Sequence, residues 1–435
     1  MKILIKNATT TPYLMGRKEE GETLVNVVVE QQRVLQVSEA AVDGDFDQVI
    51  DATGLFLSPG LIDPQVHFRE PGMEYKEDIE SGSKAAVKGG FTAVISMPNT
   101  SPTADNPEVV QFMVDKAKSA GLCKVYPTGA LSLGLKGETL CDYEALKQAG
   151  AIAITDDGKG VQDDNLFEQA LINAKMSGLP VLDHSEDESL SAQGAIHAGE
   201  IAKKYGVKGI KPESESVHVK RGCEMSEKTG AHYHVLHVST KDSIDAIRAA
   251  KLKGIKVTAE VSPHHLLLCD EDIKVKEDGT LDANWKMNPP LRSSEDRAAC
   301  QAALLDGTID AVATDHAPHS PDEKAMDIES APFGIIGLET SFPLLYTHFV
   351  KTKKLSLNQC IDLMSKQAGG LFGLNCGRIL EGTKADLVLL DLKQEFTVDE
   401  DYFASKSVNS PFINDSLFGR PRLTMVEGKV VFNEM

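Results

Sequence analysis

The sequence predicts an α/β fold, a (β/α)8 TIM barrel with a small β-sandwich domain built from the N- and C-terminal segments. Three observations support it. Strand and helix patterns alternate through the middle of the chain, and both ends are rich in short strands. In addition, His or Asp residues follow several of the middle strands. We therefore divide the chain into an N-terminal part of the sandwich (1–58), a barrel domain (59–376) and a C-terminal part of the sandwich (377–435).

Composition restricts the class of protein. The 435 residues include 45 Lys and Arg against 65 Asp and Glu, a net charge of −20. Because nothing so acidic offers a basic surface for phosphates, we exclude nucleic acid as a partner. No apolar run suits a signal peptide or a membrane span, so no membrane partner is expected. Seven scattered cysteines without C-x-x-C spacing favour a reducing, cytoplasmic location.

The two ends of the chain have the pattern of short strands. β-branched residues dominate there and no helical period is visible. A Glu427-Gly428 pair within the last strand region indicates a hairpin turn. The expected strands are Lys2–Ala8, Thr23–Glu30, Arg33–Ser38, Gln48–Asp51, Ala385–Leu392 and Arg422–Phe432.

The middle of the chain contains eight strand patterns, the number that closes a parallel barrel. We interpret the apolar run Leu55–Ile62 as the first, a buried parallel strand. The other seven are expected at Thr92–Met97, Lys124–Ala130, Ala151–Thr155, Pro180–Asp183, His232–Val238, Lys256–Val261 and Ile309–Thr314. Helices are expected at Lys76–Lys88, Asn106–Ala120, Tyr143–Gln148, Leu166–Met176, Leu190–Tyr205, Glu213–Lys228, Lys241–Lys253 and Ser294–Leu305. A doubly wound open sheet is the alternative, but neither G-x-G-x-x-G nor a P-loop supports it.

Side chains of the types that commonly bind metals follow five of these strands. They are His67, Asp157, His184, His237 and Asp315. In a β/α barrel this end of the strands carries the chemistry. His and carboxylate ligands suit Zn²⁺, and a catalytic ion needs about three of them plus an open position. Since five candidates exceed that need, a carboxylate shared by two ions would use them all, with Asp315 placed to act as the general base.

Each candidate also has a structural explanation when it is taken singly. A lone His after an apolar strand is more often a core or surface residue, and Asp156-Asp157-Gly158 by itself reads as a turn. We interpret the pairs His264-His265 and His232/His234 as structural. The repetition of strand ends in order favours metal binding. From the residues alone, the prediction ends at a metal-dependent barrel enzyme.

Nine motifs in the chain resemble those of dihydroorotases of the bacterial, zinc-dependent type, which are amidohydrolase-type barrels. They are Leu61–Gly72, Met97–Thr100, Thr155–Gly158, Asp183–Glu186, His234–Thr240, Thr258–His265, Lys286–Arg292, Ala313–His319 and Ala331–Gly334. Jointly they are highly specific. The resemblance implies the reversible cyclisation of N-carbamoyl-L-aspartate to (S)-dihydroorotate in pyrimidine biosynthesis, with one or two Zn²⁺ per subunit.

The resemblance also implies roles for individual residues. The five strand-end residues would be the metal ligands, with Asp157 as the bridge and Asp315 as the general acid/base. Three residues would hold the substrate carboxylate, for which Arg offers a planar fork: Arg69, Asn99 and His319. Contacts to the ring would come from Asn288 and from the backbone of Phe333 and Gly334. Separately from the resemblance, the charged composition of the segment 319–331 predicts a mobile loop that closes over the substrate, with a merely exposed loop as the alternative.

One ligand position departs from the family. The family pattern at the first strand is His-x-His, and this chain has Gln65-Val66-His67. An amide oxygen is a poorer zinc ligand than an imidazole, so the ion nearer this strand should bind more weakly. The chain is then an enzyme with one labile or missing ion, a protein with an introduced substitution, or a catalytically silent relative that assembles with aspartate transcarbamoylase.

We favour an active enzyme, because every other ligand is present together with Arg69 and Asn99. Another cyclic-amide hydrolase, such as an allantoinase or a dihydropyrimidinase, is a further alternative. Asp157 argues against it, since those relatives carry a modified lysine at this position. A homodimer is the general default for such a chain, although no segment identifies an interface.

Overall fold

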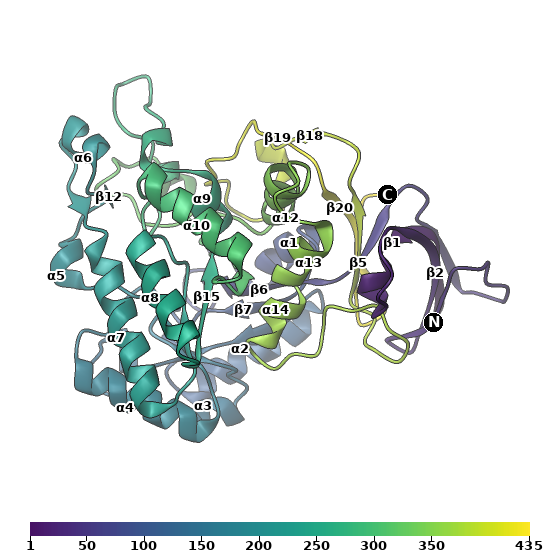
Figure 1. Ribbon diagram of the computed structural model, residues 1–435, viewed down its shortest axis with the longest axis horizontal. Helices are drawn as coiled ribbons and strands as arrows, with labels where there is room; N and C mark the ends of the chain where they lie inside the picture. Colours follow the sequence, from purple (N-terminus) through teal and green to yellow (C-terminus); the bar gives the residue numbers. More distant parts are fainter.

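The computed structural model describes residues 1–435 and consists of a helix-covered barrel beside a smaller sheet domain (Figure 1). Both chain termini lie in the sheet domain, at the right of the view. The barrel occupies the larger, left part, with its strands inside and its helices around them. This is the α/β arrangement that the sequence predicts.

Parallel strands close the barrel. β6 (Leu61–Val66), β7 (Phe91–Ser96) and β8 (Lys124–Pro127) pair in order. β9 (Gly129–Ala130) begins two residues after β8 ends, and the two segments together form the third strand of the barrel. The next five strands follow in chain order: β10 (Ile154–Thr155), β11 (Val181–Asp183), β14 (Tyr233–Val235), β15 (Val257–Val261) and β16 (Ala311–Val312). A parallel bridge between Val66 and His316 joins the last position to the first. The predicted eight-stranded barrel is confirmed.

Helices cover the barrel, and side-chain caps define where most of them begin. The main ones are α1 (Ile79–Lys88), α2 (Pro107–Ala120), α3 (Tyr143–Gln148), α4 (Asp164–Ser177), α7 (Glu213–Thr229), α8 (Lys241–Leu252) and α10 (Ser294–Asp306). Asp78, Asn106 and Ser293 each accept a hydrogen bond from the first turn of the helix that follows. Short helices follow the last strand: α12 (Ser341–Leu345), α13 (Leu357–Leu363) and α14 (Lys366–Gly370). The buried faces of helices and strands form one continuous core.

The predicted strand Leu55–Ile62 is wrong, because the run divides at Gly60. β5 (Phe56–Pro59) pairs antiparallel with β17 (Leu387–Asp391) in the sheet domain, and β6 then enters the barrel. A Cβ on Gly60 would lie 2.2 Å from Thr92 Oγ1. The close approach of this backbone to Thr92 therefore requires glycine, and it lets the chain pass directly from one domain to the other.

The predicted helix Leu190–Tyr205 is also wrong, because a short strand interrupts it. α5 (Glu188–Ser191) ends, β12 (Ile196–His197) pairs in parallel with β13 (Gly209–Ile210), and α6 (Glu200–Tyr205) follows. The break comes where Ala192 and Gln193 adopt positive φ values of 50° and 61°. Backbone in the left-handed region ends a helix, and ordinary residues give no sequence signal for it.

The sheet domain is a single mixed sheet to which both ends of the chain contribute. Its order is β21 (Lys429–Asn433), β20 (Arg420–Val426), β17, β5, β1 (Lys2–Thr10), β2 (Thr23–Glu30) and β3 (Arg33–Ser38), with β4 (Gln48–Asp51) beside β1. The sheet folds over one core, since Val27 of β2 and Met425 of β20 belong to the same buried cluster. The hairpin turn at Glu427-Gly428 is present, with positive φ at both residues. The domain boundaries at 58 and 376 stay predictions.

Two further features concern the whole chain. All seven cysteines are unpaired, and every one except Cys376 is buried. No helix has both the length and the apolar character that a membrane crossing needs. The fold thus depends on its cores rather than on disulfide cross-links.

Candidate active site

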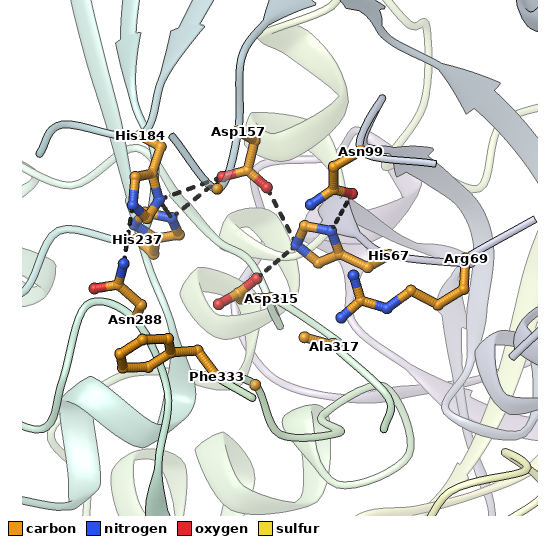
Figure 2. A pocket seen from close by; sticks show the side chains of 12 residues that line it. His67, Arg69, Asn99, Asp157, His184, His237, Asn288, Asp315, Ala317 and Phe333 are labelled. Atoms are coloured by element: carbon orange, nitrogen blue, oxygen red, sulfur yellow. Dashed lines mark hydrogen bonds and ion pairs between the residues drawn. The ribbon is translucent and has the colours of Figure 1, made fainter. Parts of the chain in front are cut away.

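A cavity of about 190 Å³ lies at the carboxyl ends of the barrel strands. Figure 2 shows that its lining side chains converge from many different strands. Every predicted site residue lines it except Gln65 and His319. The geometric prediction that residues far apart in the sequence meet in one pocket therefore holds for the five strand-end residues and for Arg69.

Asp157, His184 and His237 form the tightest group in the cavity. His184 Nδ1 and His237 Nε2 are 3.0 Å apart, and each lies 3.5 Å from Asp157 Oδ1. All three residues are buried, and their ligand atoms lie within 4.8 Å of one another. Two imidazoles and one carboxylate match the number and kind of ligands in catalytic metal sites. The residues present fit a metal ion.

A second group lies on the other side of Asp157. Its Oδ2 atom is 3.1 Å from His67 Nε2, and Asp315 Oδ1 is 3.0 Å from the same nitrogen. Asp157 thus presents one oxygen to each group, as a carboxylate shared by two ions must. Asp156 turns away and accepts the backbone N–H groups of Leu131 and Ser132, at 2.8 and 2.9 Å. The geometry therefore separates two neighbouring carboxylates that the residues alone left equivalent.

Charge is concentrated on the imidazoles. Burial opposes protonation of His67 and His184, but hydrogen bonds to carboxylates outweigh it and raise their pKa values to about 9 and about 10. Burial likewise favours the neutral form of Asp157, yet its three histidine partners hold its pKa well below the usual value. Without metal, protonated imidazoles therefore stand where cations would bind, and metal binding must displace those protons.

Neighbouring side chains fix the orientation of the two outer imidazoles. His184 Nε2 lies 3.0 Å from Glu186 Oε2, and Asn288 Nδ2 donates to the same oxygen at 2.7 Å. His67 Nδ1 lies 2.9 Å from Asn99 Oδ1. Each ring therefore donates one N–H to a side-chain oxygen and turns its other nitrogen toward Asp157. Sequence reasoning missed Glu186, for which the only signal was its position two residues after His184.

Arg69 is the cationic side chain of the cavity. It is 8% exposed, and its Nε donates to Pro318 O at 3.3 Å. One terminal nitrogen lies 3.3 Å from His319, and the other has no protein partner. Figure 2 shows the guanidinium beside His67 and Ala317. Burial lowers the pKa of Arg69 to about 10, so the group stays charged at neutral pH and offers a fork to an anion.

His319 lies behind Arg69 rather than on the cavity wall. Its Nε2 donates to Phe333 O at 2.7 Å, and its Nδ1 accepts from Lys76 Nζ at 3.1 Å. Burial and the nearby charges of Arg69, Lys76 and Lys324 depress its pKa, so the ring is neutral. In this arrangement His319 supports the Phe333 backbone, and a direct contact with substrate stays a prediction.

Buried lysines hold the segment 319–331, which contains α11 (Pro321–Lys324). Lys324 is 5% exposed and donates to the carbonyl oxygens of Lys286, Pro332 and Gly334 at 3.2, 3.0 and 2.9 Å. Lys286 donates in turn to two carbonyls of the segment. The charged composition suggested a solvated loop, but these acceptors are backbone atoms that a sequence does not reveal. Closure over the substrate stays a prediction.

Unusual backbone conformations occur where strands deliver side chains to the cavity. Arg69, His237 and Asp315 have φ values of 61°, 32° and 50°. Non-glycine residues seldom adopt positive φ, and such strain is concentrated at functional sites. All three residues line the cavity, so the strained backbone and the converging polar side chains coincide.

Comparison with known proteins gives the family. A family profile described as dihydro-orotase-like matches residues 54–243, and one described as amidohydrolase family matches residues 250–432. The dihydroorotase of Brevibacillus brevis is 49% identical over 414 residues, covering 95% of this chain and 96% of the relative. The chain belongs to the dihydroorotase family. It is therefore a hydrolase. The dihydroorotase of Bacillus caldolyticus is a further relative, 50% identical over 388 residues that cover 89% of this chain and 90% of the relative.

Solved structures of amidohydrolases share the fold of this dihydroorotase family member. L-hydantoinase (dihydropyrimidinase) from Arthrobacter aurescens has a TM-score of 0.84 at 26% identity, with 99% of this chain and 96% of that chain covered. D-hydantoinase (dihydropyrimidinase) from Thermus sp. has a TM-score of 0.81 at 27% identity, with 99% and 95% covered. The fold is common to both kinds of enzyme, so the distinction between them depends on site residues.

Proposed function

We propose that this chain catalyses the reversible cyclisation of N-carbamoyl-L-aspartate to (S)-dihydroorotate and water, the dihydroorotase reaction of pyrimidine biosynthesis. One observation carries the proposal: the buried Arg69 guanidinium faces the same cavity as the metal-type groups around Asp157. Dihydroorotate carries a carboxylate that dihydrouracil and hydantoin both lack. The volume of about 190 Å³ is below the roughly 300–1,000 Å³ of sites for drug-sized ligands, and suits one small ring.

Zinc is the proposed metal. Asp157, His184 and His237 would hold one Zn²⁺, and His67, Asp157 and Asp315 would hold a second ion. When bound, such ions lower the pKa of water toward neutrality and stabilise the charge that develops on the attacked carbonyl oxygen. The imidazole-rich character of the first group supports zinc there.

Proton transfer is assigned to Asp315. Its Oδ1 atom lies 3.0 Å from His67 Nε2, whereas Oδ2 has no protein partner. In ring opening this carboxylate would accept the proton of the attacking water and pass it to the amide nitrogen as the C–N bond breaks; in ring closure the proton would move from that nitrogen through Asp315 to the hydroxide that leaves as water. A carboxylate whose second oxygen is unpaired and faces the cavity is suited to both directions.

Substrate orientation is assigned to the opposite wall. Arg69 would bind the substrate carboxylate in a fork, with Asn99 Nδ2 as a neutral second donor because Asn99 Oδ1 is already paired with His67. Asn288 and the Phe333-Gly334 backbone line the cavity near His184 and would contact the ring amide. These contacts would hold the amide carbonyl next to the metal-type groups and so reduce the entropy cost of the reaction.

Turnover of three substrates tests the proposal: dihydroorotate, dihydrouracil (the same ring without the carboxylate) and hydantoin. We expect a clear preference for dihydroorotate. Charged hydrogen bonds contribute about 1.5–3 kcal/mol each, so Arg69→Met should lower kcat/KM for dihydroorotate by about 10²-fold. The same variant should leave the slow turnover of dihydrouracil unchanged. Faster turnover of hydantoin or dihydrouracil than of dihydroorotate would overturn the assignment.

A homodimer, an association with aspartate transcarbamoylase and a cytoplasmic location stay predictions. The catalytically silent alternative has Gln65 as its sole support, while the five other proposed ligands all line one cavity. We therefore retain the active enzyme as the proposal.

A further inference from the structure

Gln65 is buried in the barrel with nothing to bind. Its side chain is 0% exposed, and neither Oε1 nor Nε2 has a hydrogen-bond partner. An unpaired buried polar group costs about 1–3 kcal/mol, so two on one residue are a substantial penalty. An apolar side chain of the same size would avoid it. A carboxamide at this position therefore indicates a binding partner that the polypeptide itself does not supply.

The neighbours of Gln65 along β6 indicate which face of the strand carries it. Val66 and Phe68 lie in the core between the strands and the helices. Gln65 and His67 alternate with them and face the barrel interior. Through Asp63 the Gln65 backbone is tied to the strand that carries Asp315, because Asp63 Oδ1 accepts the N–H groups of Gln65 and Thr314, each at 3.1 Å. Gln65 thus belongs to the side of the metal centre formed by His67 and Asp315.

We propose that Gln65 Oε1 is a ligand of the ion on the His67 side, and that it makes this position selective for a harder cation than zinc. The inference rests on the proposed metal centre. The His67 side would have one nitrogen donor (His67) and three oxygen donors, from Gln65, Asp157 and Asp315. The other side has two nitrogen donors, His184 and His237, and one oxygen donor.

Donor chemistry sets the expected preference. Carboxylate and carbonyl oxygens suit Mn²⁺ and Mg²⁺, whereas imidazole suits Zn²⁺. An imidazole at position 65 would give both sides two nitrogen donors and make them alike. Glutamine instead makes them different, so a mixed zinc–manganese centre is the expected resting composition when both cations are present.

Sequential loading of the metal-stripped full-length chain tests this inference. One equivalent of Zn²⁺ is added, Mn²⁺ is then titrated, and bound Mn²⁺ is followed by electron paramagnetic resonance with elemental analysis of both metals. Wild type should hold one Zn²⁺ and one Mn²⁺. Gln65→Leu should weaken Mn²⁺ binding at least about tenfold, since even outer-shell partners change metal affinity by that factor, and should leave Zn²⁺ content unchanged. Gln65→His should bind two Zn²⁺ and exclude Mn²⁺.

The alternative makes the opposite prediction. If Gln65 only fills space, Gln65→Leu removes two unpaired polar groups, raises the thermal midpoint and leaves Mn²⁺ affinity as in wild type. That result, or a wild-type chain that takes two Zn²⁺ equally well in the presence of Mn²⁺, overturns the inference. These readouts need no substrate. Dihydroorotate turnover without the cation difference would therefore reject only this inference, and the cation difference without turnover would reject only the proposed activity.

Discussion

Asp157 and Asp315 are both buried carboxylates at strand ends, but their surroundings differ. Asp157 faces three imidazoles, which outweigh burial and keep its pKa well below the usual value. It is therefore a permanent anion, suited to hold cations and unsuited to accept a proton. Asp315 contacts His67 through one oxygen and leaves the other unpaired. Of the two, Asp315 is the residue that can exchange a proton with a substrate.

Asp315→Asn tests that assignment. Asparagine keeps the size of the side chain but cannot act as a base, so kcat/KM for dihydroorotate should fall at least about 10²-fold, the usual contribution of general base catalysis. Zinc held by Asp157, His184 and His237 should remain, which elemental analysis of the same preparation will show. Asp322→Asn, on the exposed surface of α11, is the matched control and should change neither quantity. Activity of the Asp315 variant within a few-fold of wild type would contradict the role.

The convergence of five strand-end residues could be predicted because a pattern recurs: an apolar strand, then His or Asp, in barrel order. The resemblance chose Asp157 over Asp156, but the residues alone gave no physical reason, since the difference lies in which of them accepts the backbone N–H groups of Leu131 and Ser132. The resemblance placed Asn99 at the substrate carboxylate, but only the structure shows that its oxygen is paired with His67 and that its nitrogen is the atom left to donate. A role that depends on which backbone group or which imidazole nitrogen a side chain contacts can be assigned only from the three-dimensional structure.

The helix α11 and the loop after it hold one wall of the cavity. Lys324 binds three carbonyls, including those of Pro332 and Gly334, and Lys286 lies over the Phe333 ring with Nζ 4.3 Å from its centroid. No carboxylate pairs with either ammonium group. Their function in the fold is therefore to replace water as the donor to backbone carbonyls of this wall.

Lys324→Met should loosen that wall. Three hydrogen bonds are lost, each contributing about 1 kcal/mol, so KM for dihydroorotate should rise about tenfold or more, while kcat changes less because the metal-type groups are untouched. Steady-state kinetics separate the two parameters. Lys220→Met, an exposed lysine on α7, is the control. A fall in kcat at unchanged KM would contradict a role in positioning the wall.

The lowered pKa of Lys324 predicts that the stability of the fold depends on pH. Burial first, and then the charge of Lys286, lower its pKa from 10.5 to about 7, against weaker opposing effects of Asp282 and Glu323. Between these values the unfolded chain binds the proton that the folded chain has lost, so the contribution of Lys324 to stability is fully present above about 10.5 and is lost as the pH falls to about 7. The difference in unfolding free energy between wild type and Lys324→Met should therefore grow from pH 7 to pH 10 in urea titrations. A constant or shrinking difference would contradict the shifted pKa.

For the whole molecule, the barrel and the sheet domain meet at Gly60. β5 and β6 are consecutive in the chain but belong to different sheets, and the single residue between them packs against Thr92. The alternation of strands and helices predicted the barrel, and the β-branched ends predicted the second domain. The division of Leu55–Ile62 escaped prediction, because both halves are equally apolar and the contact that separates them comes from β7.

Gly60→Ala measures how tightly this junction is packed. The added methyl group meets Thr92, so the variant should lose about 1–3 kcal/mol of unfolding free energy, the usual cost of overpacking. In a Thr92→Gly background the same change should cost clearly less. A double-mutant cycle from urea unfolding gives the coupling directly. An equal cost in both backgrounds would show that the glycine is needed for another reason.

The whole assignment depends on a bound metal, so removing and restoring that metal is the decisive experiment. Dihydroorotate hydrolysis is followed in protein stripped by a chelator, with residual metal determined by elemental analysis, before and after zinc is added back. The stripped protein should be inactive, and zinc should restore turnover in proportion to the metal bound. Full activity in verified metal-free protein, or no activity in protein that has bound zinc, would contradict a metal-dependent dihydroorotase built around Asp157.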